Sequence, residues 1–144
     1  MEIKMELTRR KLLAIGSSTF ALASISSLPA FASLTDDAIA ALTGGADLGE
    51  GAITLTAPEI AENGNTVPIE FDAPGAAEVT LFADGNPVPS VATFKFGPLS
   101  GSRSASTRIR LAGTQNVVAI AKMEDGSFQL AKANVKVTIG GCGG

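Results

Sequence analysis

The sequence predicts an all-β protein, an immunoglobulin-like β-sandwich of about seven strands with a short N-terminal helix and a flexible glycine-rich C-terminal arm. From Gly51 onward, apolar residues recur with a period of two in short runs. Turn-forming groups such as Asn63-Gly64-Asn65 and Asp125-Gly126 separate these runs. Regularly spaced short strands are typical of two packed antiparallel sheets. The strands are expected at 52–57, 66–72, 78–83, 91–97, 104–112, 116–123 and 127–139.

Alternation within single strands indicates which face of each strand is buried. Ile69 and Phe71 alternate with Glu70 and Asp72, and residues 135–139 alternate in the same way. Because successive side chains of a strand point to opposite faces, one face of each strand packs inward. The last strand is therefore expected to stay attached to the core as far as Ile139, within a sandwich domain over 51–139.

A short helix is expected just before the sandwich, at 33–45, and is followed by a linker to residue 50. Thr35 or Asp36 can cap it, and Gly44-Gly45 can end it. Its apolar stripe is suited to cover the core like a lid, and consists of Ala38, Ile39 and Leu42.

The first 32 residues have the order of an export signal. Thr8-Arg9-Arg10-Lys11 precedes an apolar run over 12–28, and Ala30-Phe31-Ala32 follows as a cleavage site. Arg9 and Arg10, preceded by a threonine, indicate the twin-arginine route. A membrane-spanning helix needs about 20 mostly apolar residues, and this run is shorter and rich in serine. We expect cleavage after Ala32, a periplasmic protein and no stable membrane anchor.

The charge of the mature chain excludes one class of partner. Removing residues 1–32 leaves 112 residues, enough for one compact domain, with seven basic and twelve acidic residues and a net charge of −5. An acidic body without tyrosine or tryptophan argues against nucleic acid as a partner. The one dense basic segment, 107–110, is interpreted as a solvated sheet face in preference to an anion contact.

The only cysteine lies in the terminal sequence Gly140-Gly141-Cys142-Gly143-Gly144. Glycine has no Cβ, so the four glycines Gly140, Gly141, Gly143 and Gly144 predict a slim, flexible arm over 140–144. An extended chain advances by roughly 3.4 Å per residue, so the thiol can stand about 10 Å beyond Ile139. Such an arm is suited to deliver a thiol into a pocket of another protein.

Cys142 lacks the helpers that a catalytic cysteine needs. The chain has no histidine, which excludes Cys/His and Ser/His catalysis and every histidine-containing metal site. A single cysteine cannot build a four-thiolate site. The sequence therefore predicts a carrier protein that is not an enzyme, with no catalytic residues, metal or cofactor of its own, on which partner enzymes act.

Four segments together resemble the SoxY family, the sulfur-carrier subunits of the periplasmic thiosulfate-oxidising system. The resemblance implies that Cys142 is the covalent attachment site for sulfur intermediates, and that the sandwich pairs with a SoxZ-like subunit as a heterodimer or larger assembly. The segments are 8–11, 58–68, 107–115 and 140–144.

The resemblance also implies which enzymes visit the thiol. A c-type haem enzyme joins thiosulfate oxidatively to the cysteine, a hydrolase releases sulfate, and a molybdenum-haem dehydrogenase oxidises the remaining sulfane sulfur. This chain has no C-x-x-C-H haem motif, so the redox cofactors are expected on the partners.

Two other functions fit parts of the sequence. A ubiquitin-like sulfur carrier would use the carboxylate of Gly143-Gly144, but its activation needs ATP, and the expected export places this chain outside the cytoplasm. A structural sandwich would use Cys142 for an intermolecular disulfide. The mass of the modified chain separates the three functions, because only the carrier holds sulfur or sulfonate on Cys142.

Overall fold

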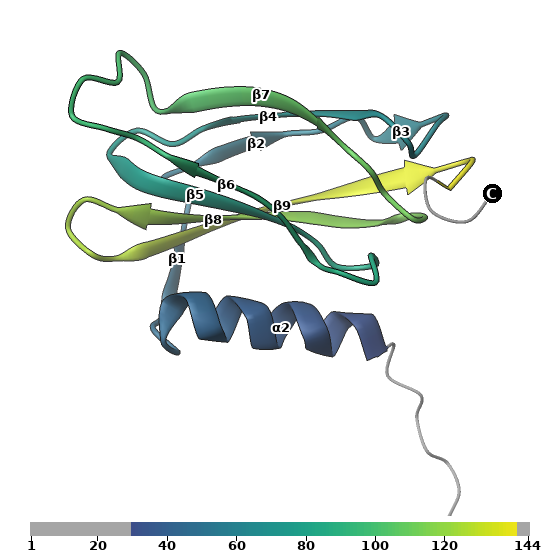
Figure 1. Cartoon of the computed structure of the whole chain (residues 1–144), viewed down its shortest axis with the longest axis horizontal. Coiled ribbons are helices and arrows are strands. Elements are labelled where there is room, and N and C mark those ends of the chain that lie inside the picture. Colours follow the sequence, from purple (N-terminus) through teal and green to yellow (C-terminus); the bar gives the residue numbers. More distant parts are fainter. Residues whose placement is uncertain (1–29, 141–144) are drawn as a thin grey trace, which may run out of the picture.

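A computed structural model describes residues 30–140, with side chains from Leu34 onward, and shows three layers (Figure 1). A helix, α2 (Ala30–Thr43), lies on the outer face of a six-stranded sheet, and a three-stranded sheet covers the inner face. The large sheet has the strand order β1-β9-β8-β5-β6, with β3 also paired to β9, and the small sheet has the order β2-β4-β7. The predicted β-sandwich with one short N-terminal helix is confirmed.

Seven of the nine strands in the described residues correspond to the seven predicted ones. Their ends differ from the prediction by one to three residues at most positions, which is the usual uncertainty of pattern-based boundaries. The bounds are β1 Leu48–Glu50, β2 Thr54–Thr56, β3 Ile60–Ala61, β4 Val67–Asp72, β5 Ala76–Ala83, β6 Ser90–Lys95, β7 Ser104–Ile109, β8 Gln115–Met123 and β9 Phe128–Val137.

The two strands that the sequence did not predict both pair with β9 in parallel. β1 lies beside residues 128–130 at the start of β9, and β3 lies beside Lys136 and Val137 at its end. All other pairs are antiparallel. The segments that contain β1 and β3 show no period of two in the sequence, unlike the 52–57 run that contains β2, and their pairing depends on residues more than 70 positions away. They were therefore beyond a pattern-based prediction.

The main core lies between the two sheets. Val67, Ile69 and Phe71 of β4 are 0–1 % exposed, and alternate with exposed Pro68, Glu70 and Asp72 as the period of two predicts. The Phe71 ring meets Phe94 edge-on at 5.1 Å and Phe96 at 6.3 Å between centroids. Burying side chains of this size stabilises the fold by roughly 1.5–3 kcal/mol each.

A second, smaller core lies between α2 and the large sheet. Phe82, Val118 and Ile120 point away from the small sheet and pack with Ile39 and Leu42 of the helix. Because both faces of the large sheet are covered, β5 and β8 are buried almost continuously instead of in alternation. The helix begins at Ala30, before the expected start at residue 33, and ends at Thr43. Gly44 and Gly45 follow it, with φ angles of +65° and +78°.

Different loops and chain segments form the two ends of the sandwich (Figure 1). We call one the arm end, because Gly140 lies there together with residues 59–66, the 84–89 loop and the 110–114 loop. We call the other the far end, formed by residues 73–75, 96–103 and 123–127. Among the described residues, no helix is long and apolar enough to cross a membrane.

Candidate functional site

The arm root, residues 138–140, leaves the sandwich between two segments of the body. The Ile139 carbonyl accepts a hydrogen bond from the Gly64 N–H at 2.8 Å, and the Gly64 carbonyl accepts one from the Leu111 N–H at 2.8 Å. Gly64 thus joins the arm root to the start of the 110–114 loop. The expected strands 104–112 and 127–139 end earlier, at Ile109 and Val137, because these irregular contacts replace a regular ladder.

Thr138 ties the arm root to the same side of the body twice. Its N–H donates to the Ala61 carbonyl at 3.0 Å, and its hydroxyl donates to the Glu62 carbonyl at 2.8 Å. On the opposite side, the Thr114 hydroxyl accepts a hydrogen bond from the Val137 N–H at 3.0 Å. The end of β9 is therefore bonded on both sides, and backbone groups that are paired in this way resist local opening.

Gly140 packs against the body instead of standing away from it. It is half-buried, and a Cβ added there would collide with the Ala112 carbonyl oxygen. The sequence placed Gly140 in the arm as one of four spacer glycines, whereas the structure gives it a close backbone contact that only glycine permits. Cys142 follows this contact by two residues, which corresponds to a reach of about 7 Å in an extended chain.

Two buried side-chain amides hold the 110–114 loop by hydrogen bonds to its backbone and to each other. The Asn86 side chain donates to the Arg110 carbonyl at 2.9 Å and accepts from the Ala112 N–H at 2.9 Å. Gln115 donates to the Asn86 Oδ1 at 3.0 Å and accepts from the Gly85 N–H at 2.7 Å. Both side chains are under 10 % exposed. We call Asn86 and Gln115 the amide pair.

The sequence analysis gave the amide pair no role. Asn86 stands in the Asp84-Gly85-Asn86-Pro87 group, which was interpreted only as turn chemistry, and Gln115 closes the 107–115 segment of the family resemblance. A sequence signal was present nonetheless. Segments 58–68 and 107–115, which carried the resemblance, both contact the arm root, for example through Gly64 on one side and Ala112 on the other.

Three large apolar side chains are exposed at the arm end. Ile60 is 60 % exposed, Val88 is 70 % exposed and Ile139 is 65 % exposed. The basic segment behaves as the sequence analysis favoured, because Arg108 and Arg110 are exposed and Arg108 pairs across the small sheet with Pro68. No group of three or more metal-ligating side chains occurs within residues 30–140.

A cavity of about 220 Å³ lies between α2 and the large sheet. Three apolar side chains form part of its lining, and two carboxylates, one lysine and one threonine form the rest. The lining residues are Thr35, Asp36, Ile39, Asp84, Val118, Leu130 and Lys132.

Several residues singled out by the sequence lie outside the described range. These are Arg9 and Arg10 of the expected export signal, and Gly141, Cys142, Gly143 and Gly144 of the expected arm. The structure therefore fixes the point to which the arm is joined, and the role of Cys142 remains a prediction from the sequence.

Several solved structures have a fold similar to that of this chain. A structure of the sulfur carrier protein SoxY from Chlorobium limicola f thiosulfatophilum has a TM-score of 0.65 and 41 % identity, and covers 75 % of this chain and 99 % of that one. Superoxide reductase (neelaredoxin) from Ignicoccus hospitalis has a TM-score of 0.54 and 14 % identity, with coverage of 60 % and 80 %. A putative superoxide reductase from Thermotoga maritima has a TM-score of 0.51 and 15 % identity, with coverage of 63 % and 87 %.

The superoxide reductases share the fold alone with this chain, given their low identity. Comparison with curated proteins gave no match. The family model described as sulfur oxidation protein SoxY matches residues 39–142, a range that begins in α2, includes the whole sandwich and ends on Cys142. Together with the 41 % identity to a SoxY sulfur carrier, this match shows that the chain belongs to the SoxY family of sulfur oxidation proteins.

Proposed function

We propose that this chain is a periplasmic sulfur carrier that holds thiosulfate-derived intermediates covalently on the Cys142 thiol and presents them to successive enzymes. The observation that carries this proposal is the extent of the family match, which runs without a break from Ile39 to Cys142. A match that ended with β9 would have supported the fold alone, whereas this one includes the cysteine.

The geometry of the arm root supports the same role. Cys142 follows Gly140, a residue that is fixed against the Ala112 carbonyl, so the thiol is joined by two residues to a rigid point of the body. A short connection limits the volume that the thiol explores, and so lowers the entropy lost when it enters an enzyme. Glycine neighbours keep the segment narrow enough to enter a tunnel.

The loading reaction must remove two electrons. The thiol loses its proton, a bond forms between its sulfur and the sulfane sulfur of thiosulfate, and two electrons leave one at a time to c-type haem. The product is a cysteine S-thiosulfonate. Water then cleaves the bond between the sulfane sulfur and the sulfonate, which releases sulfate and one proton and leaves a protonated persulfide. The chain has one cysteine and no histidine, so both steps need partner enzymes.

Three kinds of partner follow from this chemistry. They are the haem enzyme that loads the thiol, the hydrolase that releases sulfate and the dehydrogenase that oxidises the remaining sulfane sulfur. A SoxZ-like subunit would form a heterodimer with the sandwich. Arg9 and Arg10 would direct export by the twin-arginine route, with Ser33 as the first residue of the mature chain.

The mass of the chain purified from thiosulfate-grown cells tests the carrier function. We expect sulfur or sulfonate mass on Cys142 that a reductant removes, and none on a Cys142→Ser variant with unchanged unfolding. Mass on Gly144 would instead support activation of the carboxylate. A covalent dimer as the only modified form would support a structural disulfide, and either result would contradict the proposal.

Gly141→Val tests whether the arm must be slim. A β-branched side chain stiffens and thickens the segment, so we expect normal reaction with small thiol reagents but impaired turnover with the partner enzymes. Leu99→Val is a matched control, because Leu99 is 99 % exposed at the far end. Equal turnover of the Gly141→Val variant and the control would refute entry of the arm into a narrow site.

A further inference from the structure

The 110–114 loop forms one of the two sides that hold the arm root. The Ala112 carbonyl lies against Gly140 of the arm root, and the Thr114 hydroxyl accepts the N–H of Val137, the last residue of β9 before the arm root. The loop follows β7 and precedes β8, and belongs to neither strand. Whatever fixes this loop therefore also fixes the point at which the arm begins.

The Asn86 side chain bonds to the loop at the two positions that flank Leu111. Its Nδ2 donates to the Arg110 carbonyl and its Oδ1 accepts from the Ala112 N–H, both at 2.9 Å. A backbone carbonyl can only accept and a backbone N–H can only donate, so the orientation of this amide is determined by its partners. Gln115 adds a third hydrogen bond to Oδ1 at 3.0 Å.

We propose that Asn86 is a positioning residue of the carrier, whose buried amide holds the 110–114 loop against the arm root so that Cys142 stays two residues from a fixed point. This inference rests on the proposed function of Cys142. Asn86 lies in the loop between β5 and β6, and it acts on the arm root through the 110–114 loop, to which it bonds at Arg110 and Ala112.

Release of the loop would change the length of the arm. The pairing of β3 with β9 ends at Val137, so without the loop the residues from Thr138 onward are held from one side only. If they join the arm, the distance from the last fixed residue to Cys142 grows from two residues to five, or from about 7 Å to about 17 Å of reach. More residues must then be ordered whenever the arm docks, which weakens docking.

A nitroxide spin label on Cys142 of the full-length chain measures this directly. Asn86→Ala should raise the mobility of the label, and should speed hydrogen exchange at the Leu111 amide by about tenfold or more, because its hydrogen bond to the Gly64 carbonyl is a contact of the released loop. Asn116→Ala is the matched control. Asn116 also bonds through its amide at the arm end, but to Asp84 at 2.7 Å and Asn134 at 3.1 Å instead of the loop.

Equal label mobility and equal exchange in the Asn86→Ala and Asn116→Ala variants would overturn the proposal. Asn86→Asp keeps the size of the side chain if the alanine variant does not fold. It replaces the donor facing the Arg110 carbonyl with an oxygen, so it should raise the label mobility in the same way. An Asn86→Asp spectrum identical to that of the parent chain would overturn the proposal too.

Kinetics with the loading enzyme separates positioning from a general loss of structure. For Asn86→Asp we expect the KM for the carrier to rise about tenfold with kcat nearly unchanged, because the seated thiol is the same and only its docking is weaker. A fall in kcat alone would contradict positioning. If Cys142 carries no sulfur in cells, the proposed function fails, whereas the label spectra still decide whether Asn86 fixes the arm root.

Discussion

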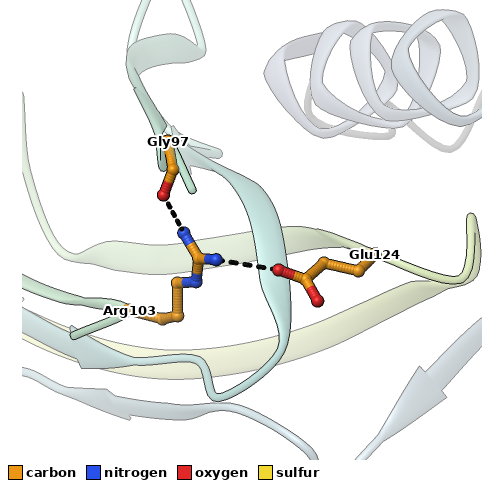
Figure 2. Close-up of polar contacts among 3 residues, drawn as sticks. All are labelled: Gly97, Arg103 and Glu124. Atoms are coloured by element: carbon orange, nitrogen blue, oxygen red, sulfur yellow. Dashed lines mark hydrogen bonds and ion pairs between the residues drawn. The ribbon is translucent and has the colours of Figure 1, made fainter. Parts of the chain in front are cut away.

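The two ends of the sandwich are stabilised by different kinds of interaction. At the arm end, the buried neutral amides of Asn86 and Gln115 connect loops that lie 24 to 30 residues apart in the chain. At the far end, Arg103 connects the loops, donating to the Gly97 carbonyl at 3.0 Å and to the Glu124 carboxylate at 2.8 Å (Figure 2). The same guanidinium lies 5.6 Å from the centroid of the Phe96 ring.

The contrast between the two ends shows that a buried amide and an ion pair near the surface hold loops with different precision. A buried amide with all its partners present has one orientation, so it holds a backbone in place. An exposed ion pair is screened by water and salt and has a looser geometry. Under the proposed function, only the arm end has to hold a specific segment, the arm root, in a fixed place. Four predictions test this contrast, in order of decreasing effect on stability.

The largest effect is expected from Phe71→Ala, in the core that supports the far end. Phe71 is 1 % exposed and packs on two other phenylalanine rings, so its removal leaves a cavity. We expect the free energy of unfolding to fall by about 3–5 kcal/mol, measured by urea denaturation. Phe71→Leu, which leaves a smaller cavity, should cost less. A loss below 1 kcal/mol would show that the core collapses around the site.

Gln115→Ala, at the arm end, should lower the free energy of unfolding by an intermediate amount. It removes the partner of the Gly85 N–H and one partner of Asn86, in a position that is 5 % exposed. Leaving such groups unpaired should lower the free energy of unfolding by about 1–3 kcal/mol. Asn134→Ala is the control, because Asn134 is exposed and should change stability by less than about 0.5 kcal/mol. Similar losses in both variants would remove the contrast between buried and exposed amides.

Arg103→Ala should have a smaller effect, about 1 kcal/mol, although it removes three contacts at once. Glu124 is 61 % exposed, so most of the effect should come from the Gly97 hydrogen bond and the contact with Phe96. A double-mutant cycle with Glu124→Gln should give a coupling energy of about 0.5 kcal/mol that decreases in high salt. A coupling that is large and independent of salt would mean that the ion pair is effectively buried.

The smallest effect is expected from Asp125→Asn in the turn between β8 and β9. Hydrogen bonds from the Ser127 hydroxyl at 2.6 Å and the Ser127 N–H at 2.8 Å lower the pKa of Asp125 below its ordinary value of 3.8. A carboxylate with a lowered pKa stabilises the fold above its unfolded pKa, and this stability is lost as the pH falls through the folded pKa. The parent chain should therefore melt slightly higher than the variant at neutral pH, and the difference should disappear in strong acid. A difference that persists in acid would contradict this cause.

Much of the fold was predictable because its signals are local. The alternation in β4, the turn groups between strands and the stripe of Ala38, Ile39 and Leu42 all appeared where the pattern placed them. At the end of β9 the alternation held for Val135 and Val137 only, because the strand ends there and Ile139, expected to face the core, is 65 % exposed. The run from Val117 to Ala121 does not alternate, and its burial on both faces became clear only once α2 and the small sheet were seen to enclose it.

The two-sheet sandwich, the covering helix and the cysteine as the candidate for chemistry all follow from the amino-acid order, because period, turn residues and the absence of histidine can be read along the chain. The pairing of β1 and β3 with β9, the packing of Gly140 on Ala112, and the support of the arm root by Asn86 and Gln115 became visible in the folded chain alone. These features join residues that are distant in the chain, and their energy depends on how deeply the groups are buried and on which partners they meet. The order of residues along the chain specifies neither the burial nor the partners.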